Sequence, residues 1–329
     1  MSSQQDVILE VENLSVGFGK ADKAVEVTSD VSFTLHRGEI LSLVGESGCG
    51  KSLSCLALTR LLPPAGKILR GSVRYFHQDG NIYDLTQVRE KLLRKLRGSS
   101  IAYIFQEPSA SLNPVFKIED QIAEVIELHR PEVSNIHSEV IKLLQDVGIP
   151  DPEKRAQAYP HELSGGMQQR IMIAMALAGK PDLLIADEPT TALDVTIQAQ
   201  ILELIDSLRK KYDMAVILVT HNLGIVAELA DQVAVMYAGM IVETATAEEL
   251  IKNPHHPYTR ALLSAVPQLG GSKKQLNTIP GTVPMPGNFP AGCRFADRCG
   301  FAQKECAFLR QFKAKGSHHY RCIKEWDEL

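Results

Sequence analysis

Three runs of apolar residues occur far apart in the chain, and each ends at polar residues. They are "EILSLVG" at 39–45, "PDLLIADEP" at 181–189 and "MAVILVTHN" at 214–222. Runs that are apolar throughout are typical of central strands in a parallel sheet that is covered on both faces. Ligands of such sheets bind at the carboxyl ends of the strands. We therefore expect the polar residues that end these runs to share one ligand site.

The segments around these runs predict the other parts of the fold. "VILEVENLSVGF" and "VTSDVSFTLHRGE", before residue 39, alternate apolar and polar residues and predict antiparallel strands. "DQIAEVIELH" and "SEVIKLLQDVGI" carry apolar residues at helical spacing, which predicts an inserted helical lobe. After about Leu250 the chain becomes rich in proline and glycine and then in cysteine. We therefore predict one domain over 1–250 and a smaller one over 251–329.

The first apolar run ends in a glycine-rich loop, "LVGESGCGKSLS". The loop fits G-x-x-x-x-G-K-[ST], whose backbone N–H groups cradle phosphate, and it lies between a predicted strand and a predicted helix. Lys51 is expected to bridge the β- and γ-phosphates, and the Ser52 hydroxyl to face Mg²⁺. The predicted phosphate-binding residues are Gly45, Glu46, Ser47, Gly48, Cys49, Gly50, Lys51 and Ser52.

The second run ends in two carboxylates with different expected roles. Asp187 follows the apolar residues directly and suits an outer-sphere carboxylate for Mg²⁺. Glu188 is placed to orient or deprotonate an attacking water. The alternative is that "DEPT" is only the acidic start of a helix.

A second anion-binding element lies in "HELSGGMQQRIMIAMALA", at 161–178. Ser164, Gly165 and Gly166 precede a predicted long amphipathic helix, and a helix start attracts anions. One triphosphate needs only one glycine loop. If two copies face each other, Ser164 of each copy is able to cap the γ-phosphate held by the other. The triphosphate would then hold the two copies together until it is hydrolysed.

The composition of the chain limits the kinds of partner that it is expected to bind. Lys and Arg total 35 against 39 Asp and Glu, so the formal net charge is −4. A mildly acidic chain has no general attraction to nucleic acid or anionic lipid. The start of the chain has no pattern of a secretory signal, and no run of about 18 apolar residues is present. We expect a soluble chain that reaches a membrane only through a partner.

The motifs together resemble an ABC-type ATPase. The resemblance rests on "GESGCGKS", "LSGGM", "LLIADEPTTALD" and "VTHNLGIV", and it covers essentially the whole chain. It implies an α/β P-loop NTPase cassette with a RecA-like core, an antiparallel β subdomain and an inserted helical subdomain, followed by the small cysteine-containing domain. "YIFQEPSASLNPVFKIEDQI", "NPHHPYTRALLSAVP" and "GCRFADRC" are similar to segments of the ATP-binding subunits of dipeptide and oligopeptide importers.

The resemblance assigns further site residues. Gln106 matches the glutamine that senses the γ-phosphate and Mg²⁺, and Asp194 matches the residue that links paired sites across a dimer. His221 matches the histidine that holds the γ-phosphate; by itself it would be read as a surface residue after a strand. Phe18 matches the aromatic residue that stacks on adenine, although it is also compatible with a core position. Asn222 departs from the family's usual aspartate.

The resemblance implies an ATP-hydrolysing motor subunit at the cytoplasmic face of the cell membrane. It would pair with a sister ATPase or a second copy of itself, and it would drive two permease subunits and, indirectly, a solute-binding protein. Peptides are the expected solute, with nickel or another solute as the alternative. A soluble ABC protein acting on nucleic acid or ribosomes is disfavoured by the single cassette and the acidic charge. A P-loop kinase is disfavoured because it needs no second anion cradle.

Four cysteines close to the C-terminus suggest a further cofactor. Their spacing, C-x5-C-x6-C-x15-C, lacks the short pairs that are typical of zinc sites. Thiolates on separate loop positions suit an iron–sulfur cluster, and the resemblance agrees with a [4Fe–4S] cluster. Zinc and no metal remain alternatives, with His318 and His319 as substitute ligands or solvated residues. ATP hydrolysis is expected not to depend on this tail. The expected ligands are Cys293, Cys299, Cys306 and Cys322.

Overall fold

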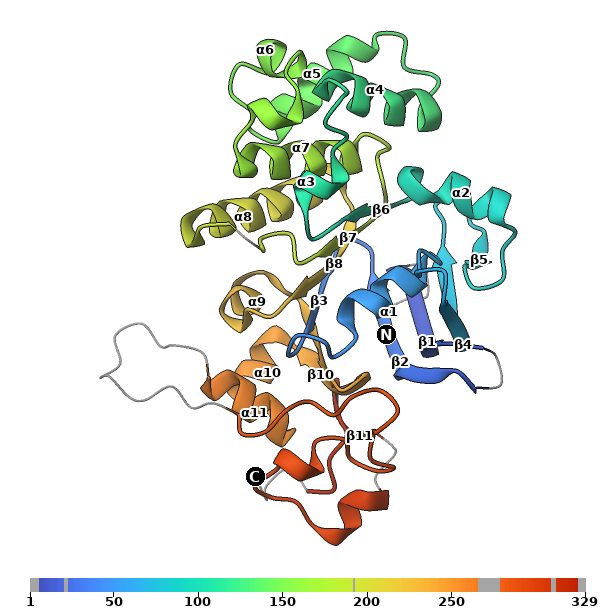
Figure 1. Ribbon diagram of the computed structural model, residues 1–329, viewed down its shortest axis with the longest axis vertical. Helices are drawn as coiled ribbons and strands as arrows, with labels where there is room; N and C mark the ends of the chain where they lie inside the picture. The colour runs from blue at the N-terminus through green and yellow to red at the C-terminus, as the bar shows by residue number, and fades with distance from the viewer. Residues whose placement is uncertain (1–5, 21–22, 192, 266–278, 309–311, 325–329) are drawn as a thin grey trace.

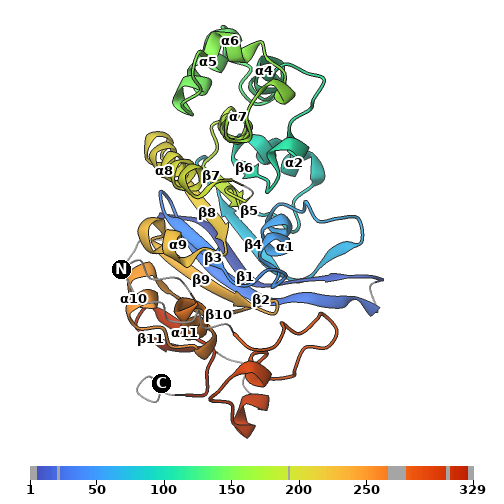
Figure 2. The same ribbon diagram turned by 60° about the vertical axis from the view of Figure 1, so that its left-hand side comes forward.

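The computed structural model describes residues 6–20, 23–191, 193–265, 279–308 and 312–324. Its parts lie in three tiers along the long axis of the molecule (Figure 1). A helical lobe forms one end, two sheets with their covering helices form the middle, and the C-terminal segment forms the other end (Figures 1 and 2). The α/β class predicted from the sequence is confirmed.

The first sheet is antiparallel, with strand order β2-β1-β4-β5. β1 pairs with both β2 and β4, so the alternating segments form the antiparallel strands that were predicted. Inward residues of β1, including Leu9, Val11 and Leu14, are buried against the central part of the molecule. The strands are β1 (Val7–Phe18), β2 (Val25–His36), β4 (Gly66–Phe76) and β5 (Ile82–Asp84).

The second sheet has strand order β11-β12-β10-β9-β3-β8-β7-β6. The pairs from β9 through β3, β8 and β7 to β6 are parallel, whereas β10, β12 and β11 continue the sheet in antiparallel pairs. All residues of β3, β7 and β8 are buried, as their apolar runs predicted. The strands are β3 (Ile40–Val44), β6 (Ile101–Ile104), β7 (Leu183–Asp187), β8 (Ala215–Thr220), β9 (Gln232–Tyr237), β10 (Met240–Thr246), β11 (Lys313–Lys315) and β12 (His318–Tyr320).

The helices cover the sheets and form the lobe. The lobe consists of α4 to α7, with a break in α2 at Arg97 and Gly98 close to its base. The helices are α1 (Lys51–Leu58), α2 (Glu90–Ser99), α3 (Pro108–Ser111), α4 (Ile118–His129), α5 (Ile136–Asp146), α6 (Pro152–Ala156), α7 (Gly165–Leu177), α8 (Val195–Tyr212), α9 (Leu223–Leu229), α10 (Ala247–Lys252) and α11 (Pro257–Ser264).

One expectation about α7 is wrong. The helix is not amphipathic along its length, because Ile171, Met172, Ile173 and Ala174 are buried in succession. It packs against α4 and α5 of the lobe on one side and against β6 on the other, in a core that also includes residues of α8 and β7. Burial from both sides replaces the single apolar stripe of a surface helix.

The C-terminal segment is joined to the rest of the molecule by a shared core and a shared sheet. Tyr258 and Phe295 pack in one cluster with Val44, Val235 and Tyr237 of the second sheet. β12 pairs with β10, so the segment also extends that sheet. The boundary between two domains near residue 250 stays a prediction. Within the described ranges, no helix is both long and apolar enough to cross a membrane.

Candidate nucleotide site

The glycine loop connects β3 to α1, and two of its glycines are required by geometry. Gly45 has φ 152°, and a Cβ there would lie 2.1 Å from the carbonyl oxygen of Met236. Gly50 has φ 102° and directly precedes α1. Lys51 is buried inside the loop, where its Nζ donates to the carbonyl oxygens of Gly45 at 2.8 Å and Glu46 at 3.2 Å. The strand, loop and helix therefore have the arrangement that the predicted phosphate cradle requires.

Asp187 lies beside the start of α1, although 135 positions separate it from Ser52. The Ser52 hydroxyl donates to Oδ1 of Asp187 at 2.9 Å, and the Tyr103 hydroxyl donates to Oδ2 at 3.1 Å. Burial raises the pKa of the Asp187 carboxyl, while both hydrogen bonds oppose that rise. A serine hydroxyl and a carboxylate side by side are oxygen ligands of the kind that Mg²⁺ prefers.

Tyr103 was not identified from the sequence. It lies on β6, which pairs with β7 in parallel and places Tyr103 opposite Ile185. The sequence around it gives little indication of a role, because single tyrosines are common in apolar strands. Only the pairing of β6 with β7 brings its hydroxyl to Asp187.

Glu188 is held in an unusual backbone conformation at the end of β7. Its φ of 46° lies in the left-handed region, and its N–H donates to the carbonyl oxygen of Val219 at 3.0 Å. Oε2 accepts hydrogen bonds from Gln106 Nε2 at 3.3 Å and from Thr191 Oγ1 at 2.9 Å. His221 Nδ1 lies 3.8 Å from the same oxygen. Strained backbone held by several neighbours is common at functional sites.

The other predicted residues lie apart from this cluster. Ser164 is exposed, and its hydroxyl accepts a hydrogen bond from the Met167 N–H at the start of α7. Asp194 is exposed at the start of α8. Phe18 lies half-buried at the end of β1, in register with Gly66. Among the described residues, no hydrogen bond joins these side chains to the glycine loop.

Asn222 has a local structural role. Its side chain accepts a hydrogen bond from the Gly224 N–H at 3.0 Å and so caps the start of α9. The amide serves the cap as well as a carboxylate would.

The C-terminal segment reaches the glycine loop directly. Two nitrogens of Arg298 bind the two carboxylate oxygens of Glu46 at 2.7 and 3.0 Å, and the Glu46 N–H donates to the Tyr258 hydroxyl at 2.8 Å. The hydrogen bonds to Glu46 raise the pKa of Arg298. Two side chains of the C-terminal segment therefore contact a residue of the loop, while the expectation that ATP hydrolysis does not depend on this segment stays a prediction.

The four tail cysteines line one small cavity, of about 10 Å³. Cys299 Sγ accepts a hydrogen bond from the Phe301 N–H at 3.4 Å, and Cys306 Sγ accepts one from the Gln303 N–H at 3.4 Å. Burial raises the pKa of Cys293 to about 11. In the part of the chain that the structure describes, no three His, Cys, Asp or Glu side chains are grouped as ligands of one metal ion.

The two histidines close to Cys322 are engaged elsewhere. His318 is buried, and its Nε2 lies 2.6 Å from Glu243 Oε1, so the expectation that it is solvated is wrong. His319 is exposed, and its Nδ1 lies 3.0 Å from the Ser317 carbonyl oxygen.

The fold and this cluster define an ATP-binding cassette, and comparisons with known proteins agree. Residues 28–191 match the ABC transporter family. A dimeric ATP-binding cassette bound to ADP and Pi has a TM-score of 0.63 at 23% identity, covering 73% of this chain and 99% of that one. The cbiO1 cassette of Clostridium perfringens, part of the cbiONQ transporter complex, has a TM-score of 0.63 at 27% identity, covering 75% of this chain and 91% of that one.

Full-length relatives narrow the class to one family. Residues 242–306 match the C-terminal region of oligopeptide and dipeptide transporters. A putative peptide import ATP-binding protein of Brucella ovis is 48% identical over 98% of both chains. Another from Brucella abortus is 50% identical over 91% of this chain and 89% of the relative. The chain belongs to the peptide-import family of ABC transporter ATP-binding subunits, and it is an ATPase.

Proposed function

We propose that this chain hydrolyses ATP between two paired cassettes and so drives the import of peptides through two permease subunits. The observation that carries the proposal is the convergence of the ends of β3, β6, β7 and β8 on one site. There the lysine and serine of the glycine loop lie beside a carboxylate pair, Asp187 and Glu188. The relatives named for peptide import support peptides as the solute.

The reaction we propose is attack of water on the γ-phosphorus of ATP. Glu188 takes a proton from the water as the new P–O bond forms and the bond to ADP breaks, which yields ADP and inorganic phosphate. Lys51 compensates charge on the β- and γ-phosphates, and His221 holds the γ-phosphate. Gln106, which donates a hydrogen bond to Glu188, orients the water. Mg²⁺ would neutralise phosphate charge when it is held beside Ser52, Gln106 and Asp187.

The second anion cradle supports a paired arrangement. The start of α7, a helix of 13 residues, is exposed or half-exposed at Ser164, Gly165 and Gly166. The N–H groups there and the positive end of the helix dipole are therefore accessible to an anion. Asp194, exposed at the start of α8, suits a contact between the two halves. A second copy or a sister subunit would place its own ATP against this surface. Phe18 is proposed to stack on the adenine ring.

The surface beside Gln106 suits a permease. The segment after Gln106 leaves Val115 72% and Phe116 51% exposed. A groove of about 360 Å³ opens between β6 and the lobe. Its lining includes Phe105, Val125, His129, Met172 and Met175. An apolar groove next to a γ-phosphate sensor is placed to pass a nucleotide-dependent movement to a membrane partner.

Cysteine cross-linking tests this docking surface. Asn113→Cys, in the exposed segment, should cross-link to a cytoplasmic loop of a co-expressed permease. Glu248→Cys, exposed on α10, is the matched control. Cross-links at residue 248 and none at residue 113 would overturn the proposed surface.

Reconstitution tests the transported solute. The chain is purified with the permeases and binding protein encoded by neighbouring genes, and ATP hydrolysis in vesicles is measured with a peptide mixture or with Ni²⁺. We expect peptides to stimulate hydrolysis. Stimulation by nickel but not by peptides would favour the alternative importer. A rate of ATP hydrolysis that changes with neither solute would contradict the assignment to import. The chain would lie peripherally at the cytoplasmic face of the membrane.

We also propose that the four tail cysteines hold a [4Fe–4S] cluster. The four side chains line one cavity, and four cysteine sulfurs are the ligands that such a cluster uses. Backbone N–H groups already donate hydrogen bonds to two of the sulfurs, as they do around bound clusters. The cavity has room for about one water, so its lining must rearrange to admit a cluster. A cluster would supply a cross-link between loops of the tail.

Anaerobic purification tests the cluster. The protein should be brown, and iron and sulfide analysis should give about four of each per chain. Cys306→Ser should remove the colour, whereas Cys55→Ser, a buried cysteine outside the tail, should keep it. Colourless protein with one zinc per chain would favour the zinc alternative, and metal-free protein with an ordered tail would exclude both.

A further inference from the structure

Glu46 places a negative charge in a loop that is expected to bind phosphate. Its carboxylate adds negative charge directly after Gly45, and Lys51 contacts the carbonyl oxygens of both residues. A negative side chain there repels the triphosphate unless it is neutralised. The structure shows what neutralises it.

Arg298 is built for this contact. Its side chain is 5% exposed, and every one of its N–H donors has an acceptor. Nη1 donates to Glu46 Oε2 at 2.7 Å and to the Tyr237 hydroxyl at 3.3 Å, while Nη2 donates to Glu46 Oε1 at 3.0 Å and to the Ile279 carbonyl at 3.2 Å. Nε donates to the Pro280 carbonyl at 2.8 Å. A two-pronged pair with no spare donor fixes the carboxylate in direction as well as in charge.

Tyr258 fixes the backbone of the same residue. Its hydroxyl accepts the Glu46 N–H at 2.8 Å, and its ring is fully buried. The ring centroid lies 4.6 Å from that of Tyr237 and 5.4 Å from that of Phe295. These rings come from β9, α11 and the tail, so the hydroxyl is held by a rigid aromatic cluster.

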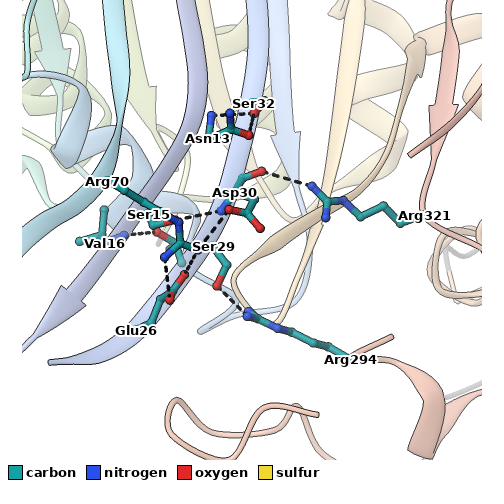
Figure 3. A network of polar contacts seen from close by, with 11 residues as sticks. Asn13, Ser15, Val16, Glu26, Ser29, Asp30, Ser32, Arg70, Arg294 and Arg321 are labelled. Atoms are coloured by element: carbon teal, nitrogen blue, oxygen red, sulfur yellow. Dashed lines mark hydrogen bonds and ion pairs between the residues drawn. The ribbon is translucent and has the colours of Figure 1, made fainter. Parts of the chain in front are cut away.

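Further tail arginines anchor the segment to the cassette around this point. Arg294 donates to Ser29 Oγ at 2.6 Å, and Arg321 donates to the Asp30 carbonyl oxygen (Figure 3). Arg294 also donates to the Ala238 carbonyl oxygen. The turn after Ala238 in turn supports the loop, because the Gly239 N–H donates to the Cys49 carbonyl at 2.8 Å. The tail therefore lies against the loop and against the turn behind it.

We infer that Arg298 and Tyr258 are positioning residues for ATP binding, which neutralise and orient Glu46 and so make the phosphate loop depend on the C-terminal segment. The inference rests on the proposed nucleotide site. It assigns these residues to nucleotide affinity and not to the chemical step, because Glu188, Gln106 and His221 lie on other elements.

Charge rescue provides the decisive test. In the full-length chain with Mg²⁺, Arg298→Ala should raise the Kd for both ADP and a non-hydrolysable ATP analogue about tenfold, or about 1.4 kcal/mol. The change leaves the negative charge of the Glu46 carboxylate unneutralised beside the phosphates. The double variant Arg298→Ala with Glu46→Gln removes that charge and should recover most of the affinity. At saturating ATP, Arg298→Ala alone should keep kcat close to that of the parent.

Two further variants separate this role from loosening of the tail. Tyr258→Phe keeps the aromatic packing but leaves the Glu46 N–H without its acceptor, so it should also weaken nucleotide binding. Arg321→Ala removes a tail arginine that does not contact the loop and should bind nucleotide like the parent. Equal losses in Arg298→Ala and Arg321→Ala, or no recovery in the double variant, would overturn the inference. A parent chain that fails to bind ATP would instead overturn the proposed function.

Discussion

Replacing Tyr103 by phenylalanine should weaken nucleotide binding only when magnesium is present. The change removes one hydroxyl, which donates to Asp187 Oδ2 at 3.1 Å, while the ring and its contact with Phe105 remain. Asp187 would keep the hydrogen bond from Ser52 but lose the one that aims its second oxygen. The perturbation therefore affects the orientation of the proposed Mg²⁺ carboxylate and leaves the phosphate cradle intact.

The size of the effect follows from the contact. A hydrogen bond to a charged group contributes about 1.5–3 kcal/mol. At 1.4 kcal/mol per factor of ten, that is about 10- to 150-fold. Loss of a residue that orients a metal ligand typically costs about 10- to 100-fold in metal affinity or activity. We therefore expect Mg²⁺-dependent affinity for ATP to fall about 10- to 100-fold.

The assay compares ATP affinity in excess Mg²⁺ with affinity in EDTA for each variant. Tyr103→Phe should match the parent in EDTA and fall behind it in Mg²⁺. Tyr83→Phe, which removes an exposed hydroxyl bonded to Asp79, is the matched control and should behave like the parent in both. Equal losses with and without Mg²⁺ would refute the reasoning, because the hydroxyl would then act on the fold and not on the metal ligand.

Three further predictions concern the site and the lobe. Glu188→Gln should keep ATP binding, trap a dimer visible by light scattering, and lower kcat by about 10²–10⁴; hydrolysis at the parental rate would show that Glu188 is not the base. Lys51→Ala removes the buried ammonium of the loop and should weaken ATP binding itself, so an unchanged titration would contradict its assignment. Glu119 raises the pKa of His137 above its usual 6.5, so the contribution of His137 to stability is present below that pH and lost as pH rises through the raised value. An NMR titration should show the pKa of His137 falling in Glu119→Gln.

The sequence was sufficient for the parts of the fold whose signals are local. Runs apolar throughout identified β3, β7 and β8, and alternation identified β1 and β2, because burial on two faces or on one face leaves a pattern within a few residues. The same strand ends predicted that Ser52 and Asp187 would meet, and they do. This success depended on a general rule about parallel sheets, not on any signal that links the two residues.

Most of the missed features depend on contacts between distant parts of the chain. Tyr103 has no motif of its own, and its role follows from strand order. Arg298 lies 252 positions from Glu46, and Tyr258 lies 212 positions from it, so nothing in the local pattern of either segment indicates the pairing. The positive φ of Glu188 is equally invisible, since glutamate is not a residue that favours it. The continuous burial of α7 arises because α4 and α5 cover a face that sequence periodicity would leave to solvent.

The contact between tail and loop changes what the cysteines are expected to do. Arg298 directly precedes Cys299, so a cluster bound there would hold the arginine that neutralises Glu46. Cys299→Ser should then raise the Kd for ATP by about the same factor as Arg298→Ala, with little change in kcat. Because both act through one contact, the double variant should bind no more weakly than either single variant, whereas independent effects would add in free energy. Additive losses measured by equilibrium binding would show that the cysteines act on the fold of the tail by a route other than Arg298, and parental affinity in Cys299→Ser would show that the loop does not respond to them.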